Sequence, residues 1–240
     1  MAVAVIVRVP PRTAETPEAE STPIASAFRD VLQVALVLGA SLLVGLAIAS
    51  RGGPLVHNRM LPWILGRTLG VACYVALCGM VTLGIWLRHP WRSRFRAPSP
   101  EALLRAHVAL AAATVSLLAG HITSLALDSY AGVGWVGTFV PWHAQYRPSA
   151  TALGTLALYA IVLVAGTAAL AGTLARRIWF PIHSVSAGIF CLCVAHGVLA
   201  GSDSQALRWM YVATGGVVVA VQITRWTARY SGDRSELDPA

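Results

Sequence analysis

The chain has 240 residues, of which 56% are hydrophobic and 12% are charged, and its net charge at pH 7 is +8. Soluble domains carry about 25% charged residues, so this composition argues against a soluble globular protein and favours one that spans a membrane. The positive charge raises the question of nucleic-acid binding. However, no aromatic residues alternate with the arginines in a recognisable binding motif, and we expect no nucleic-acid partner.

Six segments are apolar and close to the roughly 20 residues that a helix needs to cross a bilayer. They cover residues 31–50, 67–87, 106–127, 149–174, 178–200 and 209–224. Residues 1–30 hold four prolines among Thr, Ser and Glu and predict a flexible cytoplasmic tail, and residues 228–240 predict a polar C-terminal tail. The sequence therefore predicts an all-α, integral membrane six-helix bundle over residues 31–227.

All eighteen basic residues are arginines, and they are unevenly distributed over the connections between the predicted spans. Thirteen lie in the N-terminal tail, in the connections at 88–105 and 176–177, and after the sixth span. The other five are Arg51, Arg59, Arg67, Arg147 and Arg208. Because arginine accumulates on the cytoplasmic side of membrane proteins, both termini are predicted to be cytoplasmic, in a multi-pass protein of the cell (plasma) membrane with lipid as its surroundings.

The four cysteines all lie within predicted spans and form neither a C-x-x-C pair nor a C-x-x-C-H motif. This pattern supports neither covalent haem attachment nor a zinc site. We interpret Cys73, Cys78, Cys191 and Cys193 as small packing residues.

Four of the seven histidines lie inside two predicted spans or at their ends: His107 and His121 in the third, His183 and His196 in the fifth. An ionisable residue in a membrane helix is costly, faces the protein interior and indicates a functional site. A hydrogen bond to a neighbouring helix would explain one such histidine, whereas four in this arrangement favour a cofactor site. The remaining three are expected to be solvated or interfacial: His57, His89 and His143.

The third and fifth spans run parallel because a single span separates them. At 1.5 Å per residue, the histidines of each span are about 20–21 Å apart, so two cross-helix pairs form at matching depths, His107 with His183 and His121 with His196. Paired imidazoles from facing helices are suited to be the axial ligands of a b-type haem, and we expect two haems. Zinc is a poorer candidate because each level offers only two ligands.

One feature of the spacing opposes this arrangement. His107 and His121 are 14 residues apart, close to four helical turns, but His183 and His196 are 13 apart. On an ideal helix this places the second pair about 140° apart around the axis. A kink or π-bulge is therefore required in the fifth span, and Pro181 and Gly188 are candidate positions.

Arginines near the span ends are candidate partners for the anionic propionates of a haem. Arg67 and Arg147 lie on the outer side, and Arg105 and Arg177 lie on the inner side. The alternative is that these arginines set the topology or bind lipid headgroups. That alternative weighs equally for Arg67 and Arg147 and is favoured for Arg105 and Arg177.

With its histidine spacing of 14 and 13 residues, the chain resembles the ferric reductase-like transmembrane family, the six-helix haem core shared with the NADPH oxidases. The resemblance covers about residues 60–205. It is closest to stand-alone actinobacterial members in the segments LDSYAGVGWVGTFVPW, YRPSATALGTLALY and HGVLAGSDS. It implies that His107, His121, His183 and His196 bind two haems.

The resemblance implies a transmembrane cytochrome b that passes electrons to an extracytoplasmic acceptor, such as a metal chelate, and so serves as an oxidoreductase component. Many family members take electrons from a cytoplasmic flavin domain fed by NADPH. This sequence has no G-x-G-x-x-G fingerprint and only about fifteen polar residues after the sixth span. We therefore expect a separate flavin/NAD(P)H reductase or a quinol as donor. The alternatives are a haem partner of a periplasmic repair enzyme, a non-catalytic haem-binding or assembly subunit, and a haem-free structural membrane protein.

Overall fold

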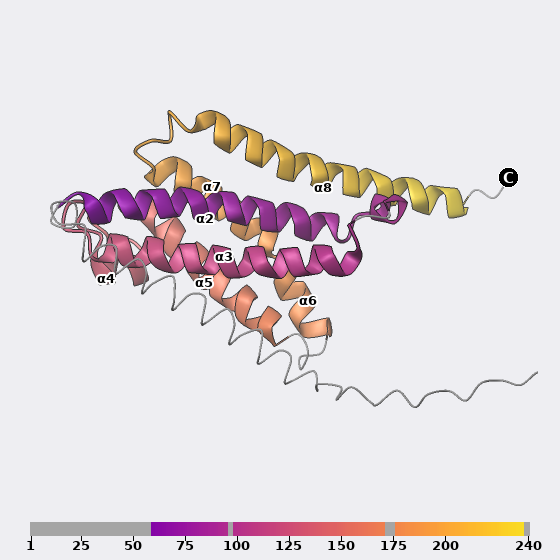
Figure 1. The fold of residues 1–240 in the computed structure, drawn as a ribbon, viewed down its shortest axis with the longest axis horizontal. Coiled ribbons are helices and arrows are strands. Elements are labelled where there is room, and N and C mark those ends of the chain that lie inside the picture. Colours follow the sequence, from indigo (N-terminus) through magenta and orange to yellow (C-terminus); the bar gives the residue numbers. More distant parts are fainter. Residues whose placement is uncertain (1–58, 96–97, 171–175, 238–240) are drawn as a thin grey trace, which may run out of the picture. The chain divides into compact units, whose positions relative to one another are not determined.

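The computed structural model describes residues 59–95, 98–170 and 176–237, and the regular secondary structure of these residues is entirely helical (Figure 1). The predicted tail over 1–30 and the first predicted span, 31–50, lie outside the described residues. In chain order the elements are α2 (Leu61–Trp86), the 3-10 helix η2 (Pro90–Arg94), α3 (Pro100–Ala126), α4 (Gly134–Phe139), α5 (Pro148–Ala169), α6 (Arg176–Ser184), α7 (Ser186–Ala200) and α8 (Arg208–Leu237).

Four stretches of the described chain are long and apolar enough to cross a membrane: α2, α3, α5 and the combined stretch Arg177–Ala200 of α6 and α7. Fewer than a third of the residues in each stretch are buried inside the protein. Soluble proteins rarely leave so much apolar surface exposed, so the exposed faces are those of a membrane protein. The all-helical fold and the presence of helices long and apolar enough to cross a membrane agree with the sequence prediction.

Helix α8 differs from the sixth predicted span. It begins at Arg208 and continues through Leu237, well beyond the predicted end at residue 224. It is not among the four candidate membrane-crossing stretches. Arg225 and Arg229 lie in its second half, where the mean hydropathy falls.

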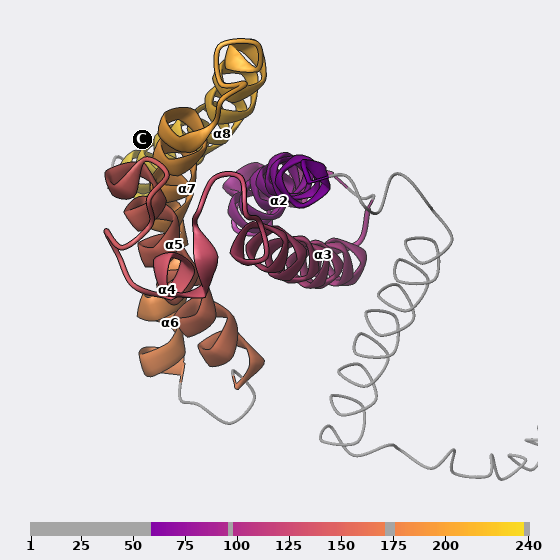
Figure 2. The ribbon, with the colours of Figure 1, turned by 90° about the vertical axis from the view of Figure 1, so that its left-hand side faces the viewer.

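A single connection joins α2 to α3, and the two helices are antiparallel neighbours. At the start of α3 the Ser99 hydroxyl accepts a hydrogen bond from the Ala102 N–H at 3.2 Å, and Pro100 occupies the first helical position. Both features are favoured at helix N-termini, because the hydroxyl satisfies a free N–H and proline has none to satisfy. The two helices pack together along their length, as Figures 1 and 2 both show.

The apolar core lies among α2, α7 and α8. The buried residues that make up this core are Tyr74, Leu77, Cys78, Val81, Phe190 and Val218. The Tyr74 hydroxyl forms a 2.8 Å hydrogen bond with the Thr214 hydroxyl of α8, which satisfies a polar group that burial would otherwise penalise. Cys73 and Cys78 are buried free thiols, as expected for packing residues, whereas Cys193 is half-buried and Cys191 is exposed.

Helix α5 packs against α7, and α7 also contacts α2, so the α5–α7 pair lies beside the α2–α3 pair (Figure 2). Antiparallel connections along the chain leave α3 and α7 running in the same direction, as the sequence predicts for the third and fifth spans. This arrangement sets the two histidine-bearing segments at corresponding depths.

The fifth predicted span is interrupted at Val185, where α6 ends and α7 begins. The Val185 N–H donates to the Ile182 carbonyl at 3.1 Å, and the Gly188 N–H donates to the Val185 carbonyl at 2.8 Å. Both are hydrogen bonds to the third preceding residue, the pattern of a 3-10 turn. The irregularity that the 13-residue spacing requires is therefore present, between the two candidate positions Pro181 and Gly188.

Candidate functional site: two pairs of histidines

The structure brings together both predicted histidine pairs. The imidazole ring centroids of His107 and His183 are 6.2 Å apart, and those of His121 and His196 are 6.3 Å apart. Within each pair the ring planes are steeply inclined, at 72° and 75°. The two pairs thus have nearly the same geometry at two levels of the helices.

These separations match those of two imidazoles bound on opposite sides of one metal. A metal–imidazole bond is about 2.0–2.1 Å long and a ring nitrogen lies about 1.1 Å from the ring centroid, so the two centroids are expected about 6.2–6.4 Å apart. A hydrogen bond between the rings would bring them closer, whereas an edge-to-face ring contact falls in the same range. Both pairs therefore fit the axial ligation of an iron porphyrin.

Hydrogen bonds to backbone carbonyls fix the tautomer of three of the four rings. The Nδ1–H of His121 donates to the Gly66 carbonyl at 2.6 Å, and that of His107 donates to the Met80 carbonyl at 3.1 Å. The Nδ1–H of His196 donates to the Ala150 carbonyl at 2.8 Å. A carbonyl oxygen only accepts, so Nδ1 carries the proton and Nε2 keeps the lone pair that a metal needs.

His183 differs from the other three. Its Nδ1 is buried and has no hydrogen-bond partner among residues 59–95, 98–170 and 176–237. The ring lies instead beside Trp179, with 5.8 Å between the two ring centroids. His183 is thus the least restrained imidazole of the four as far as the described residues show.

The interruption at Val185 explains how a 13-residue spacing still aligns two histidines. Four turns over 13 residues need about 3.25 residues per turn, which lies between the 3.6 of an α-helix and the 3.0 of a 3-10 helix. The two 3-10 bonds near Val185 tighten the winding between His183 and His196. The measured pairing of both rings with those of α3 shows that the interrupted segment does bring His183 and His196 to the same side.

A cavity of about 170 Å³ adjoins the His121–His196 pair and is lined by both residues. Most of its wall is apolar or aromatic, including Trp63, Leu118, Leu158 and Tyr211. Such a lining suits the faces of a porphyrin, while the two imidazoles supply the polar contacts.

Of the two arginines that the sequence assigns to the outer side, Arg67 lines this cavity and Arg147 does not. The Arg67 guanidinium forms an ion pair with Asp203, with 2.8 Å between Nη2 and Oδ2, and only 15% of its side chain is exposed. Arg147 donates to the Leu199 and Gly201 carbonyls at 2.7 and 3.4 Å, which closes the C-terminal end of α7. Arg67 is therefore the better placed of the two to meet an anionic group of a cofactor.

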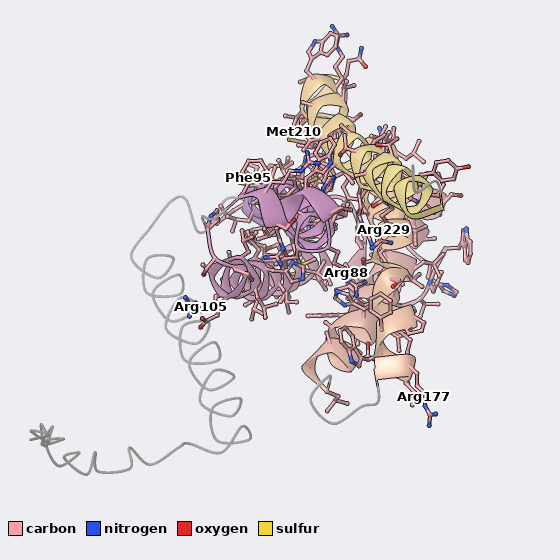
Figure 3. The ribbon with its side chains drawn as sticks, turned by 90° about the vertical axis from the view of Figure 1, so that its right-hand side faces the viewer. Arg88, Phe95, Arg105, Arg177, Met210 and Arg229 are labelled. Carbon is pink, nitrogen blue, oxygen red and sulfur yellow. The ribbon has the colours of Figure 1, made fainter. Side chains whose placement is uncertain are left out.

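Neither inner arginine predicted from the sequence reaches the His107–His183 pair. Arg105 forms an ion pair with Glu101 at 2.6 Å, with 70% of its side chain exposed, and Arg177 is also exposed. Figure 3 shows both projecting away from the helices, whereas Arg88 lies between the two groups of helices. The Arg88 guanidinium carbon lies 3.9 Å from the centroid of the Phe180 ring.

Sequence reasoning passed over Arg88 because five arginines crowd that connection and nothing in their spacing distinguishes one. Its contact with Phe180, three residues before His183, depends on how α2 and α6 approach each other. Only the tertiary structure supplies that information.

His89 departs from the expectation of a solvated or interfacial side chain. It is 3% exposed and lies between Trp86 and Trp91, with its ring centroid 5.1 Å from each. His143 is exposed, as expected for a loop histidine, and His57 lies outside the described residues. His89 is far in sequence from Thr224, its partner on α8, so the sequence offered no signal of its burial.

Within the part of the chain that the structure describes, no three or more His, Cys, Asp or Glu side chains converge on one point. A zinc site of three or four protein ligands is not formed by these residues, whereas two imidazoles suffice for a metal that a porphyrin already holds. No family model, no curated protein and no solved structure matches this chain.

Proposed function

We propose that this chain is a transmembrane electron-transfer protein that binds two b-type haems, each between one histidine of α3 and one of α6–α7. The observation that supports it best is the repeated ring separation of 6.2 and 6.3 Å, which equals that of two axial imidazoles on one metal. When bound, each haem would accept and release one electron at its iron.

Each histidine pair has its own role in the proposed function. His107 and His183 would hold one haem on the inner side, and His121 and His196 would hold the other on the outer side. A haem held by two histidines would be suited to electron transfer rather than to oxygen binding. Carbonyl-bound Nδ1–H groups keep three of these imidazoles in the tautomer that ligates.

The two histidine pairs lie about 20 Å apart along the helices, since their members are 13 or 14 residues apart at 1.5 Å per residue. Two such sites, one above the other, provide a route for electrons across the apolar part of a bilayer. The donor is a separate flavin-containing reductase or a membrane quinol, and the acceptor is extracytoplasmic, as in the ferric reductase-like family that the sequence resembles.

The direct test is the haem content and the reduced-minus-oxidised spectrum of the purified protein. We expect two haems per chain with a low-spin b-type signal, falling towards one in His121→Ala and in His183→Ala. His143→Ala is the matched control, because that histidine is exposed in a loop and forms no pair. Full haem content in all four alanine variants of the paired histidines would refute the proposal.

A second measurement separates electron transfer from haem storage or assembly. Membrane vesicles that contain the protein and an inner reductant should reduce an impermeant ferric chelate on the outer side. The double variant His121→Ala/His183→Ala should abolish this reduction. A haem-loaded protein that reduces no outer acceptor with any donor would indicate an assembly subunit instead.

A further inference from the structure

The three carbonyls that accept from histidine share one arrangement with the residues that follow them. Gly66 is followed four residues later by Gly70, Met80 by Gly84, and Ala150 by Gly154. In each case the histidine that binds the carbonyl also lies over the glycine: His121 over Gly70, His107 over Gly84, and His196 over Gly154.

The spacing of four has a physical cause. In an α-helix the carbonyl of one residue accepts the N–H of the fourth residue after it, and its second lone pair faces sideways. Side chains lean towards the helix N-terminus, so the side chain at that fourth position covers the turn that holds the carbonyl. A glycine there leaves the second lone pair open to an imidazole from a neighbouring helix.

The distances show how little room there is. A Cβ added at Gly154 would lie 2.6 Å from Cε1 and 2.7 Å from Nδ1 of His196. One added at Gly70 would lie 2.8 Å from the same two atoms of His121. At Gly84 the distance to His107 Cε1 is 3.1 Å, which is tight but less severe.

We infer that Gly70, Gly84 and Gly154 are positioning residues that set the tautomer and orientation of the paired histidines by exposing the carbonyl four residues before each of them. They act through His121, His107 and His196 and have no chemistry of their own. The expected effect on haem binding rests on the function proposed above, whereas the placement of the rings does not.

The helices offer matched controls for this inference. Gly166 is in α5 with Gly154, and an added Cβ there meets nothing within 4 Å. Gly79 is in α2 with Gly70 and Gly84, and an added Cβ meets only Leu110 Cδ1, at an ordinary 3.7 Å. Alanine favours helix more than glycine does, so Gly166→Ala and Gly79→Ala should leave the fold and the histidines unchanged.

The first experiment is to purify Gly70→Ala, Gly84→Ala and Gly154→Ala with both controls, and to measure haem per protein and the low-spin ferric EPR signals. We expect Gly70→Ala and Gly154→Ala to lose the outer haem and fall from two haems towards one. We expect Gly84→Ala to keep its haems but shift the signal of the inner one. Unchanged haem content and signals in Gly70→Ala and Gly154→Ala would overturn the inference.

A folding failure is separated from a positioning effect by a second variant. Gly154→Ala combined with His196→Ala removes the ring that the new methyl group meets, so the double variant should regain the expression and thermal stability of His196→Ala alone. If it stays as unstable as Gly154→Ala, the glycine serves the packing of α5 and not the histidine, and the inference is wrong.

Failure of the proposed function would be visible separately. If the wild-type protein binds no haem, the tautomers remain measurable from the ¹⁵N shifts of the histidine rings in membranes. We expect the rings of His107, His121 and His196 to be Nδ1-protonated in the wild type and the controls. This tautomer should be lost at His121 in Gly70→Ala and at His196 in Gly154→Ala. Equal tautomer populations in all five variants would overturn the positioning role whether or not haem binds.

Discussion

His89 links the α2–α3 connection to α8 through both of its ring nitrogens. Nδ1 accepts a hydrogen bond from the Trp91 N–H at 3.1 Å, so the proton of the neutral ring is on Nε2, which donates to the Thr224 hydroxyl at 3.3 Å. Protonation of Nδ1 would remove the acceptor that caps η2. Burial of the ring, and secondarily the charge of Arg225, lower the pKa of His89 below its ordinary value of 6.5.

A lowered pKa makes the stability of this region depend on pH. Above about 6.5 the ring is neutral in both the folded and the unfolded chain, and His89 contributes no pH dependence. Below that value the unfolded chain takes up a proton that the folded one resists. We expect the melting temperature to fall as the pH decreases from 6.5 towards the lowered pKa, measured by thermal unfolding in detergent.

The matched variants for this prediction are His89→Gln and His143→Gln. The first should weaken the pH dependence and lower the free energy of unfolding by about 1–2 kcal/mol, the usual effect of losing a cap and a hydrogen bond. The second alters an exposed loop histidine and should leave the curve unchanged. An identical pH profile in the wild type and in His89→Gln would show that His89 is not responsible.

Substitution of Arg67 tests whether its side chain holds the outer haem. Its guanidinium lies at the cavity wall and is held there by Asp203, whose own side chain is 59% exposed. We expect Arg67→Ala to weaken retention of the outer haem about tenfold or more, since a hydrogen bond to a charged group contributes about 1.5–3 kcal/mol. The measurement is haem transfer to apomyoglobin over time.

Asp203→Asn is the control for Arg67, because it keeps the guanidinium and removes only its exposed partner. We expect this variant to hold the outer haem as well as the wild type. If Asp203→Asn loses haem as fast as Arg67→Ala, the ion pair matters for the fold of the outer end and Arg67 has no direct part in binding.

Among the helices, the alignment of the two histidines in α3 followed from their spacing in the sequence, whereas the alignment of those in α6–α7 did not. Fourteen residues in α3 are two heptads, so His107, Thr114 and His121 follow one face, and Thr114 between them is buried. The 13 residues from His183 to His196 fit no uninterrupted α-helix. The sequence predicted that a distortion must exist, but its position at Val185 depended on tertiary packing.

The interruption leads to a prediction about insertions. One alanine added after Val185 gives His183 and His196 the 14-residue spacing of α3, so a regular helix aligns them, and we expect both haems to be retained. One alanine added after Thr114 rotates His121 by about 100° relative to His107. We expect that variant to fall to one haem or fewer by absorbance. Equal loss from both insertions would contradict this account of Val185.

The inclination of the rings gives a spectroscopic prediction for the helix pairs. Helices α3 and α6–α7 present their imidazoles at 72° and 75°, close to perpendicular. Perpendicular axial imidazoles make the two iron orbitals that mix with the ligands nearly equal in energy. We therefore expect strongly anisotropic low-spin ferric EPR signals from both haems. Rhombic signals typical of parallel rings would mean that the ligands lie differently.

For the whole molecule, the arginine distribution predicts how the helices cross the membrane. Thirteen arginines on one side and five on the other favour cytoplasmic termini. We expect a fluorescent protein fused after Ala240 to fluoresce, and alkaline phosphatase inserted near Trp142, in the external connection, to be active. The reversed pattern would invert the assignment of inner and outer haems without changing the pairs themselves.

Composition and hydropathy determined the all-helical class and the membrane-spanning helices, because a chain in lipid must satisfy its backbone hydrogen bonds within each helix. The same local reasoning identified the four histidines as candidate ligands, since an ionisable group in an apolar helix is costly and indicates a functional site. Both properties depend on residues near one another in the sequence, which is why the sequence alone sufficed for them.

Contacts between distant segments were decided only by the tertiary structure. They include the carbonyls that bind the imidazoles, the glycines that expose those carbonyls, the burial of His89 against α8, and the choice of Arg67 and Arg88 over Arg105, Arg147 and Arg177. Each depends on which faces of two helices meet, at separations of 27 to 135 residues for the hydrogen bonds. Helical periodicity fixes which residues share a face, but the packing of the helices decides what that face touches.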